Sequence, residues 1–270
     1  MKWNKTELLD RLSRDGDGRL LLARTLDKLE SAQRRSIPTH TNFLSPSERA
    51  DVESLLAACG HPAHLFFGGF DGAERTVCYF LPDWQEEEDA LELERQGEGI
   101  LRALRCTYPA DSGLTHRDFL GSILGQGITR ETIGDLIVCP DHCDILLLQE
   151  VEDFLLLHLE SAGRTKLKIK PLPLEEVEPP VVTVKTIRDT VSSPRLDAVA
   201  AAGFSTSRGK AADLISSGRV QLNHRECTKP DRLVSEGDVI SCRGLGKCRV
   251  KSLSGQTKKG RIPVELERYI

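Results

Sequence analysis

The sequence of 270 residues has no long apolar run. Its apolar runs, such as those at 145–148 and 154–157, are far shorter than the roughly 20 residues that a membrane-spanning helix requires. The N-terminal stretch MKWNKTELLDRL is amphipathic and charged, and it lacks the apolar core of a signal peptide. We therefore expect a cytoplasmic protein without a membrane partner.

Paired cysteines of the C-x-x-C type are also missing, although the chain has eight cysteines. The closest groupings of cysteine and histidine, at 59–64 and 139–143, would need distant residues to complete a tetrahedral zinc site. A chain of this length does not depend on disulfides for its stability. We therefore expect reduced thiols in ordinary packing, and neither a metal nor a cofactor.

No nucleotide-binding motif is complete. The stretch GFSTSRGKAADLI, residues 203–215, resembles a phosphate loop, but five residues separate Gly203 from Gly209 and Ala211 follows Lys210. A phosphate loop needs one residue fewer between its glycines, and a serine or threonine after the lysine to bind magnesium. We expect a joint between two helices here instead.

Catalytic and calcium-binding motifs are incomplete as well. The tripeptide HRD at 116–118 matches a kinase catalytic loop, but Ile123 occupies the position of the metal-binding asparagine. The sequence DGDG at 15–18 resembles the start of a calcium loop, but no glutamate closes it. A capped helix and a turn are the expected structures.

Charge is distributed unevenly along the chain. Residues 181–270 contain 17 lysines and arginines against 9 acidic residues, a net charge of +8, whereas residues 1–180 carry −12. A basic C-terminal third on an acidic body indicates a polyanionic partner for that third.

Composition also suggests where the chain divides. Residues 171–180 include four prolines and three glutamates and show no helical or strand period, so we expect a linker. A weaker boundary is expected at about residue 68. The expected parts are a mainly helical N-terminal subdomain at 1–68, a central α+β domain at 69–170, the linker and a C-terminal domain at 181–270.

Local patterns predict the elements of the first two parts, and together they indicate an α+β fold. Leucines recur at helical spacing near the N-terminus, and Ser45 opens a helix that ends at about Ala58 with a capping box. Strands are expected at 64–81 around a turn, and at 100–106, 135–138, 144–149 and 165–170. Thr115 and Asp118 cap a helix, and a second helix at 150–161 is expected to be buried. On the first helix and the turn after it, Arg117 and Arg130 are candidate contacts to RNA phosphate.

The basic third predicts two short helices followed by short strands. Pro194 precedes a helix that stops at Gly203, and Ser207 caps a second helix from Arg208 to about Ser216. Strands are expected at 220–223, 238–243 and from 248 onward. Cations distributed around these elements suit phosphate binding: Arg195, Arg208, Lys210, Arg219, Arg225, Lys229 and Arg243.

The stretch RLDAVAAAGFSTSRGKAADLISSGRVQLN, with EGDVISCRG after it, resembles the S4 RNA-binding domain over residues 181–255. The resemblance implies an RNA surface on the paired helices and the following strand. By matching position it implicates Arg195, Ser207, Arg208, Lys210, Arg219 and Asn223. His224 stands where many such domains have glycine, and a side chain there tolerates the left-handed turn conformation less well.

Further stretches resemble the bacterial YlmH-type proteins over nearly the whole chain, and also a photosystem-associated S4-domain group. They are GGFDGAER at 68–75, FLPD at 80–83 and LTHRDFLGSILGQGITRETIGD at 114–135. The resemblance implies an RNA-recognition-like central sheet and a C-terminal S4 domain. It also implies association with the large ribosomal subunit and tRNA when stalled translation is rescued.

We therefore expect a non-enzymatic, monomeric RNA-binding protein whose partners are rRNA or peptidyl-tRNA. The alternative is an RNA-modifying enzyme, a pseudouridine synthase or methyltransferase, that uses the basic domain for delivery. Against it, Asp197 lies inside the small domain, without a pocket-forming sheet to hold a flipped base. A scaffold with its basic face on an acidic protein or a membrane surface is a third possibility.

Overall fold

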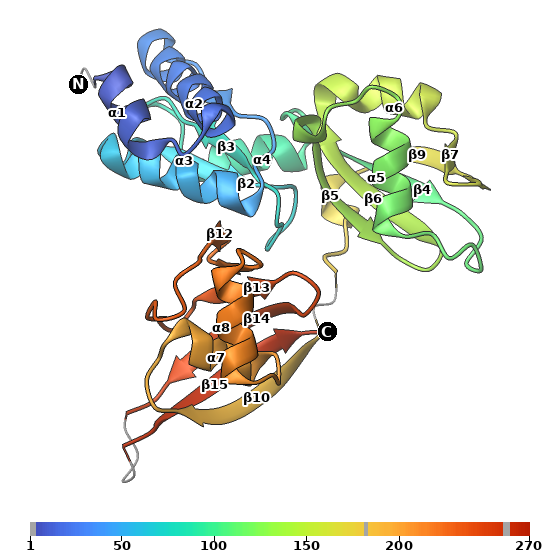
Figure 1. The fold of residues 1–270 in the computed structure, drawn as a ribbon. Coiled ribbons are helices and arrows are strands. Elements are labelled where there is room, and N and C mark those ends of the chain that lie inside the picture. The colour runs from blue at the N-terminus through green and yellow to red at the C-terminus, as the bar shows by residue number, and fades with distance from the viewer. Residues whose placement is uncertain (1–3, 181–182, 256–259) are drawn as a thin grey trace. The chain divides into compact units, whose positions relative to one another are not determined.

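The computed structural model describes residues 4–180, 183–255 and 260–270 (Figure 1). The chain divides into two compact units, which we call unit 1 (residues 1–180) and unit 2 (residues 181–270). Residues 181 and 182, where the C-terminal domain was expected to begin, lie outside the described residues. Helices and antiparallel sheets occur in both units, which confirms the α+β class.

The N-terminal lobe of unit 1, residues 4–100, packs helices on a small sheet. The helices are α1 (Lys5–Leu12), α2 (Gly16–Arg35), α3 (Pro46–Ala58) and α4 (Glu87–Arg95), and the strands are β1 (Thr39–His40), β2 (His64–Phe67) and β3 (Val77–Phe80). The expected capping box opens α3: Glu48 N donates to Ser45 Oγ at 3.4 Å, and Ser45 N donates to the Glu48 carboxylate at 2.6 Å. Leucines at helical spacing bury one face of α1, α2 and α3 in a common core.

The expected boundary near residue 68 falls inside this lobe. Strands β2 and β3 pair directly, with Phe66 opposite Cys78, and both belong to the sheet of order β1-β3-β2. Residues 68–76 are therefore a hairpin connection. Glycine-rich composition favours a tight turn as readily as a flexible linker, so composition alone did not distinguish the two.

The central sheet domain, residues 101–177, has the strand and helix order βαββαβ. Its elements are β4 (Leu101–Thr107), α5 (His116–Leu124), β5 (Ile133–Val138), β6 (His142–Leu148), α6 (Glu152–His158) and β9 (Lys168–Leu172). The sheet order is β5-β6-β4-β9, and all neighbours are antiparallel. A small hairpin of β7 (Ser161–Ala162) and β8 (Thr165–Lys166) precedes the last strand, and the turns η1 (Arg130–Thr132), η2 (Gln149–Val151) and η3 (Leu174–Glu176) complete the domain.

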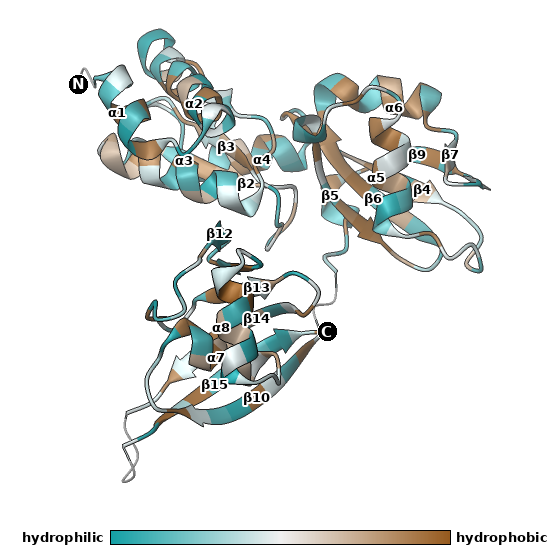
Figure 2. Ribbon diagram, in the orientation of Figure 1, coloured by the Kyte–Doolittle hydropathy of each residue, from teal (hydrophilic) through white to brown (hydrophobic). Residues whose placement is uncertain are grey.

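Both faces of the central sheet are packed. Phe119 and Ile123 of α5 and Leu155 of α6 cover one face. On the other face, Val77 and Tyr79 of β3 share a core with residues of β4 and β6. The resulting layers run helix, small sheet, large sheet, helix, and β5 and β6 are hydrophobic along most of their length (Figure 2).

Helix α6 is less buried than its sequence suggested. Leu155 is fully buried, but Leu157 is 73% exposed and Phe154 lies on the surface, where its ring stacks on His158 at 4.5 Å. The helix spans only Glu152–His158, about two turns, so it can turn only one side toward the sheet. The expectation of a buried helix at 150–161 was wrong.

One arginine, Arg75, and one aspartate, Asp135, connect the N-terminal lobe to the central sheet domain. Arg75 donates from Nε to the Ile133 carbonyl at 2.9 Å, and from Nη2 to the carbonyls of Phe43 at 3.1 Å and Arg130 at 3.2 Å. Asp135 accepts hydrogen bonds from the backbone N–H groups of Glu74, at 2.7 Å, and Arg75, at 3.1 Å. These contacts tie the 68–76 connection to β5.

The expected linker, residues 171–180, belongs to unit 1. Leu172 ends β9, and Leu172 and Val177 are buried in the core between the two sheets. Proline and glutamate gave this segment the composition of a linker, but apolar side chains between them anchor it. The two compact units divide after Pro180.

Unit 2 packs two helices on one face of a six-stranded sheet. The helices are α7 (Leu196–Gly203) and α8 (Arg208–Ser216), and the strands are β10 (Val184–Val191), β11 (Val220–Leu222), β12 (Arg225–Glu226), β13 (Val239–Cys242), β14 (Gly246–Leu253) and β15 (Ile262–Tyr269). The order is β10-β15-β14-β13-β11-β12. Leu196 and Val199 of α7 and Ile215 of α8 share the core with Val250 and Leu266 of the sheet.

Gly203 is the last residue of α7 and marks a close approach of helix to sheet. A Cβ atom at this position would lie 2.8 Å from Cys248 Sγ and 3.3 Å from Leu266 Cδ1. The residue that turns the chain after the helix is Ser205, whose φ is 52°. Gly203 therefore serves packing rather than the left-handed helix stop that the sequence suggested.

Candidate nucleic-acid interface

A buried carboxylate joins the starts of the two helices of unit 2. Asp197 Oδ1 accepts from Arg195 Nε at 3.2 Å, and Oδ2 accepts from Arg195 Nη2 and Arg208 Nε, each at 3.1 Å. The Asp197 side chain is only 6% exposed, whereas Arg195 and Arg208 are 35% and 51% exposed. The carboxylate thus holds two guanidinium groups in place while leaving part of each open to solvent.

The hydrogen bonds between Asp197 and its two arginines favour the charged form of the carboxylate. Burial raises the pKa of Asp197, but the hydrogen bonds from Arg195 and Arg208 outweigh burial and lower it below its usual value. The hydrogen bonds to Asp197 in turn raise the pKa of Arg195. All three side chains are therefore charged at neutral pH, with one net positive charge.

The first turn of α8 adds to this positive charge. Ser207 caps the helix by accepting a hydrogen bond from Lys210 N at 3.2 Å, as its position in the sequence predicted. The turn contains Arg208 and Lys210, both exposed, and no acidic residue. A helix N-terminus carries a partial positive charge, and the first turn of α8 has no acidic side chain to compensate it. The end of this helix therefore favours binding of an anion from another molecule.

The loop before β13 lies against the start of α7. Leu196 N donates to the Arg232 carbonyl at 2.7 Å, and Asp197 N donates to the Pro230 carbonyl at 3.0 Å. The loop thus brings the exposed Lys229 and Arg232 to the same end of the helices. Arg232 was not among the candidates from the sequence. Its position shortly after Pro230 and before the next expected strand indicated a cation in a turn.

A second group of candidates lies at the other end of α8. Arg219 Nη2 donates to the Arg243 carbonyl at 3.1 Å, and Arg243 N donates to the Arg219 carbonyl at 3.0 Å. Helix α8 has nine residues, so its ends are about 13 Å apart. The structure therefore separates these candidate residues into two groups. The helix-start group contains Arg195, Ser207, Arg208, Lys210 and Lys229, and the helix-end group contains Arg219 and Arg243.

Asn223 has a structural task. Its Nδ2 donates to Asp238 Oδ1 at 2.8 Å, and its Oδ1 accepts from Val239 N at 2.9 Å. With φ of 50° and 63°, Asn223 and His224 form a two-residue turn between β11 and β12, so His224 does adopt the left-handed conformation. Arg225 follows in β12 and is half-buried.

Two of the nine acidic residues of unit 2, Glu265 and Glu267, are paired on the sheet face opposite the helices. Glu265 of β15 pairs with Arg188 at 2.9 Å and with Lys251 at 3.0 Å, and Glu267 pairs with Lys251 at 3.3 Å. These side chains alternate with Val264 and Leu266, which face the helices in the core. The positive charge at the helix ends is therefore not cancelled by this set.

The two candidates in unit 1 differ from each other. Arg117 is exposed on α5. Arg130 is half-buried and donates from Nη1 to the carbonyls of Ile133 at 2.6 Å and Gly134 at 3.0 Å. Burial, reinforced by the nearby charge of Arg75, lowers the pKa of Arg130 to about 10. Arg130 therefore uses hydrogen-bond donors to stabilise the fold. An RNA contact of Arg117 stays a prediction.

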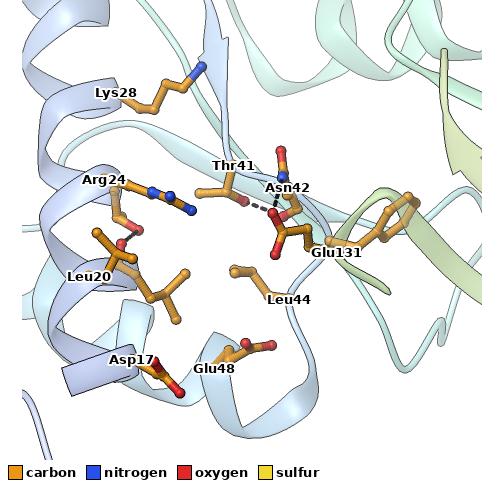
Figure 3. Close-up of a pocket in the computed structure, with 12 residues that line it drawn as sticks. Asp17, Leu20, Arg24, Lys28, Thr41, Asn42, Leu44, Glu48 and Glu131 are labelled. Carbon is orange, nitrogen blue, oxygen red and sulfur yellow. Dashed lines mark hydrogen bonds between the residues drawn. The ribbon is translucent and has the colours of Figure 1, made fainter. Parts of the chain in front are cut away.

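A pocket of about 370 Å³ lies in the N-terminal lobe, between α2 and residues 41–44 (Figure 3). Arg24 points from α2 across it toward Thr41 and Glu131, and Lys28 lies one turn further along the helix (Figure 3). The carboxylate of Glu48 is engaged in its capping box, and Glu131 accepts from Asn42 Nδ2 at 3.4 Å. Two of the three acids on its walls, Glu48 and Glu131, thus serve local structure.

The eight cysteines are free thiols. Burial raises the pKa of Cys106 and Cys248 to about 12, so both remain protonated at neutral pH. Within the described ranges 4–180, 183–255 and 260–270, no three His, Cys, Asp or Glu side chains are grouped to hold a metal ion. Across the same residues, no helix is both long and apolar enough to cross a membrane.

Two family models match the chain. Residues 101–176 match the "putative RNA-binding domain in YlmH", which coincides with the central sheet domain. Residues 194–240 match the S4 domain, from the start of α7 to β13. The C-terminal S4 domain expected from the sequence is therefore confirmed, with the helix-start group inside it.

Similar proteins agree with these models. The chain is 32% identical over 230 residues to the "ribosome-associated protein quality control protein P2" of Bacillus subtilis (strain 168), covering 84% of this chain and 86% of that protein. It is 33% identical over 79 residues to the "small ribosomal subunit protein uS4" of Solibacter usitatus (strain Ellin6076), covering 27% and 38%. Among solved structures, the "cell division protein ylmH from Streptococcus pneumoniae" matches at 21% identity with a TM-score of 0.49, covering 62% of this chain and 98% of that one. The extent of the Bacillus subtilis match and the two domain models together show that this chain belongs to the YlmH family.

Proposed function

We propose that this protein binds ribosomal RNA or tRNA through the helix-start and helix-end groups of unit 2, without a catalytic step of its own. The observation that carries the proposal is the Asp197-centred pair of arginines beside the uncompensated N-terminus of α8. Fixed guanidinium groups and a helix N-terminus are both suited to phosphate.

The relative's name and the S4 match support a site of action on the ribosome. The Bacillus subtilis protein is named for ribosome-associated quality control, and the Solibacter usitatus protein is a component of the small ribosomal subunit. We propose that this chain acts as a monomer in the cytoplasm, on the large subunit or its peptidyl-tRNA, when translation stalls. Ribosome co-sedimentation that ribonuclease abolishes would support this placement.

Charge reversal tests the surface itself. We expect the double variant Arg208→Glu, Lys210→Glu to lose at least tenfold in affinity for bulk ribosomal RNA in a filter-binding assay. The loss follows because phosphate contacts release counterions, each contributing about 0.7 to 0.9 to the salt dependence of log K. The wild type should therefore also bind much more weakly as salt is raised from 50 to 200 mM.

The matched control is Arg188→Glu, Arg249→Glu, with the same change of charge in the same unit. Arg188 pairs with Glu265 on the face opposite the helices, and Arg249 lies between the core residues Cys248 and Val250, so it points the same way. Circular dichroism melts verify that both double variants are folded. Equal losses in the two variants would mean that net charge, and not the helix ends, governs binding.

A further inference from the structure

The central sheet turns part of one face toward the N-terminal lobe. Ala103 of β4, Leu146 of β6 and Leu172 of β9 lie on this face and are buried against Phe43 and Tyr79. In RNA-recognition domains the bases of single-stranded RNA stack on aromatic side chains of such a sheet. In this protein that half of the face is filled by protein.

The other half of the same face continues as two polar rows. Arg105 lies opposite Asp144 and Lys170, and Thr107 lies opposite His142 and Lys168. Side chains directly opposite each other in an antiparallel sheet project from the same face, and alternate residues along a strand do so too. We call these six residues the uncovered end of the sheet: Arg105, Thr107, His142, Asp144, Lys168 and Lys170.

One part of the uncovered end is electrically neutral. Arg105 binds Asp144 through two hydrogen bonds, Nε to Oδ1 at 2.7 Å and Nη2 to Oδ2 at 2.6 Å, and Asp144 is almost completely buried. Arg105 Nη2 also reaches the Glu176 carbonyl at 3.4 Å, which places the 174–177 segment at the border of the surface. The positive charge of the surface therefore lies on β9.

Strand β9 and the residues before it form a basic edge. Lys166, Lys168 and Lys170 are exposed, and they alternate with Leu167 and Ile169, which pack against the core under α5 and α6. Successive lysines are about 7 Å apart along an extended chain. Strand β9 is at the edge of its sheet, so its outer side carries no partner strand among the described residues.

The charge of this edge stands out within its unit. Residues 164–170, RTKLKIK, contain four cations and no acid, in a unit with a net charge of −12. In the described part of the chain no carboxylate lies within 4.0 Å of the three lysines, whereas many other cations of unit 1 are paired, among them Arg49 and Arg102. The neighbouring polar groups are engaged within the protein: Thr107 Oγ1 donates to the Lys168 carbonyl at 3.3 Å, and His142 Nδ1 contacts Asp141 Oδ1 at 2.8 Å. The lysines therefore carry the charge that this surface offers to a phosphate.

We propose that the uncovered end of the sheet, with Lys166, is a second RNA-binding surface that contacts phosphates and not bases. None of its residues is Phe, Tyr or Trp, the large aromatic side chains on which bases stack, so its binding is independent of base sequence. The proposal rests on the proposed function of unit 2, because it adds a second contact to the same RNA partner. Edge lysines also discourage strand pairing between molecules, and the experiment separates the two roles.

Lysine footprinting tests both surfaces at once. The full-length protein is acetylated with and without bulk ribosomal RNA, and modification of each lysine is read by mass spectrometry. We expect RNA to protect Lys166, Lys168 and Lys170 together with Lys210 and Lys229, and to leave Lys251 unchanged. Protection of Lys210 and Lys229 alone would overturn the second surface and leave the proposed function standing, whereas no protection at all would remove both.

The variant Lys168→Gln, Lys170→Gln measures the size of the contribution. Loss of two phosphate contacts lowers the slope of log Kd against log salt by about 1.4, which corresponds to roughly tenfold weaker binding near 0.15 M salt. Arg24→Gln, Lys28→Gln, on α2 of the same unit, makes the same charge change and should leave the affinity unchanged. A variant that self-associates in size-exclusion chromatography but keeps its affinity and slope would assign the lysines to edge protection. Equal protection of these lysines by polyglutamate would also overturn the RNA proposal.

Discussion

Two pairs of arginines, one pair in each unit, are used in opposite ways. In unit 1, Arg75 and Arg130 are half-buried and donate to main-chain carbonyls of residues 43, 130, 133 and 134. In unit 2, Arg195 and Arg208 share the carboxylate of Asp197 and stay partly exposed. Burial lowers the pKa of Arg75 and Arg130, whereas the hydrogen bonds to Asp197 raise that of Arg195.

The difference shows that the hydrogen-bond acceptor next to an arginine determines whether its guanidinium group stabilises the fold or stays available for a ligand. A guanidinium has five N–H donors in a rigid plane. Where carbonyls take most of them, as at Arg75, the side chain fixes the fold. Where one small carboxylate orients two guanidinium groups, as at Asp197, donors remain for a phosphate outside the protein. A count of arginines in the sequence therefore overestimates how many guanidinium groups of unit 1 are available to bind phosphate. In unit 2 the same count does not reveal that one carboxylate holds two guanidinium groups in fixed positions.

The largest effect is expected from Arg75→Ala. The change leaves the carbonyls of residues 43, 130 and 133 without this donor, and an unsatisfied buried acceptor costs about 1–3 kcal/mol. Because water replaces part of the loss, we expect unit 1 to lose about 3 kcal/mol of unfolding free energy. Urea denaturation followed by tryptophan fluorescence measures this, since both tryptophans, Trp3 and Trp84, belong to unit 1.

Arg117→Ala is the matched control, because Arg117 is exposed on α5 of the same unit. An exposed substitution of this kind changes stability by less than about 0.5 kcal/mol. A midpoint for Arg75→Ala as close to the wild type as that of Arg117→Ala would show that the carbonyl contacts of Arg75 contribute nothing.

A smaller effect, with a gain in RNA binding, is expected from Asp197→Asn. Removing the shared negative charge weakens three charge-assisted hydrogen bonds, and we expect a loss of about 2 kcal/mol in unit 2. The same change releases two guanidinium groups to phosphate, so the slope of log Kd against log salt should steepen by about 1. Hydrogen exchange of the 196–216 peptides and salt-dependent filter binding measure the two effects.

Asp213→Asn makes the same charge change on the exposed side of α8 and serves as the control. If it steepened the salt slope as much as Asp197→Asn, the gain would come from net charge alone. The hydrogen-bonded geometry at Asp197 would then have no part in RNA binding.

Local sequence signals predicted much of this molecule. The caps at Ser45, Thr115 and Ser207 and the helices that they open are in the structure, because a cap depends on side chains within three residues of it. The cations at the start of α8 were likewise identified from the sequence, since the motif that places them is contiguous.

Features that depend on distant partners were not predicted. Strand β10 pairs with β15 through residues 71 to 85 positions apart, the largest separation being that of Val184 and Tyr269, and nothing within β10 indicates that partner. Asp197 was seen only as a possible catalytic residue, because its role depends on Arg208, one helix later. Arg130 was a candidate contact to RNA phosphate, and only the fold shows that its side chain donates to the carbonyls of Ile133 and Gly134.

The smallest effect is expected from acid, and it has opposite signs at two aspartates. Burial raises the pKa of Asp135 in unit 1, so the folded state binds its proton more tightly than the unfolded state does. Hydrogen bonds from Arg195 and Arg208 overcome the effect of burial and lower the pKa of Asp197 in unit 2. Stability rises with pH wherever the unfolded state binds more protons, so Asp197 stabilises its unit above the ordinary aspartate pKa of about 3.9 and Asp135 does not.

Unfolding followed between pH 6 and pH 3 in wild type, Asp135→Asn and Asp197→Asn tests this sign. As pH falls through the folded pKa of Asp197, the stability advantage of the wild type over Asp197→Asn should shrink, because the protonated side chain no longer attracts the arginines. As pH falls through the higher folded pKa of Asp135, the wild type should instead gain relative to Asp135→Asn, because protonation removes a buried charge. If stability depended on pH in the same way in the two variants, the two aspartates would have similar surroundings. The proposed contrast between the arginines of unit 1 and those of unit 2 would then have no electrostatic basis.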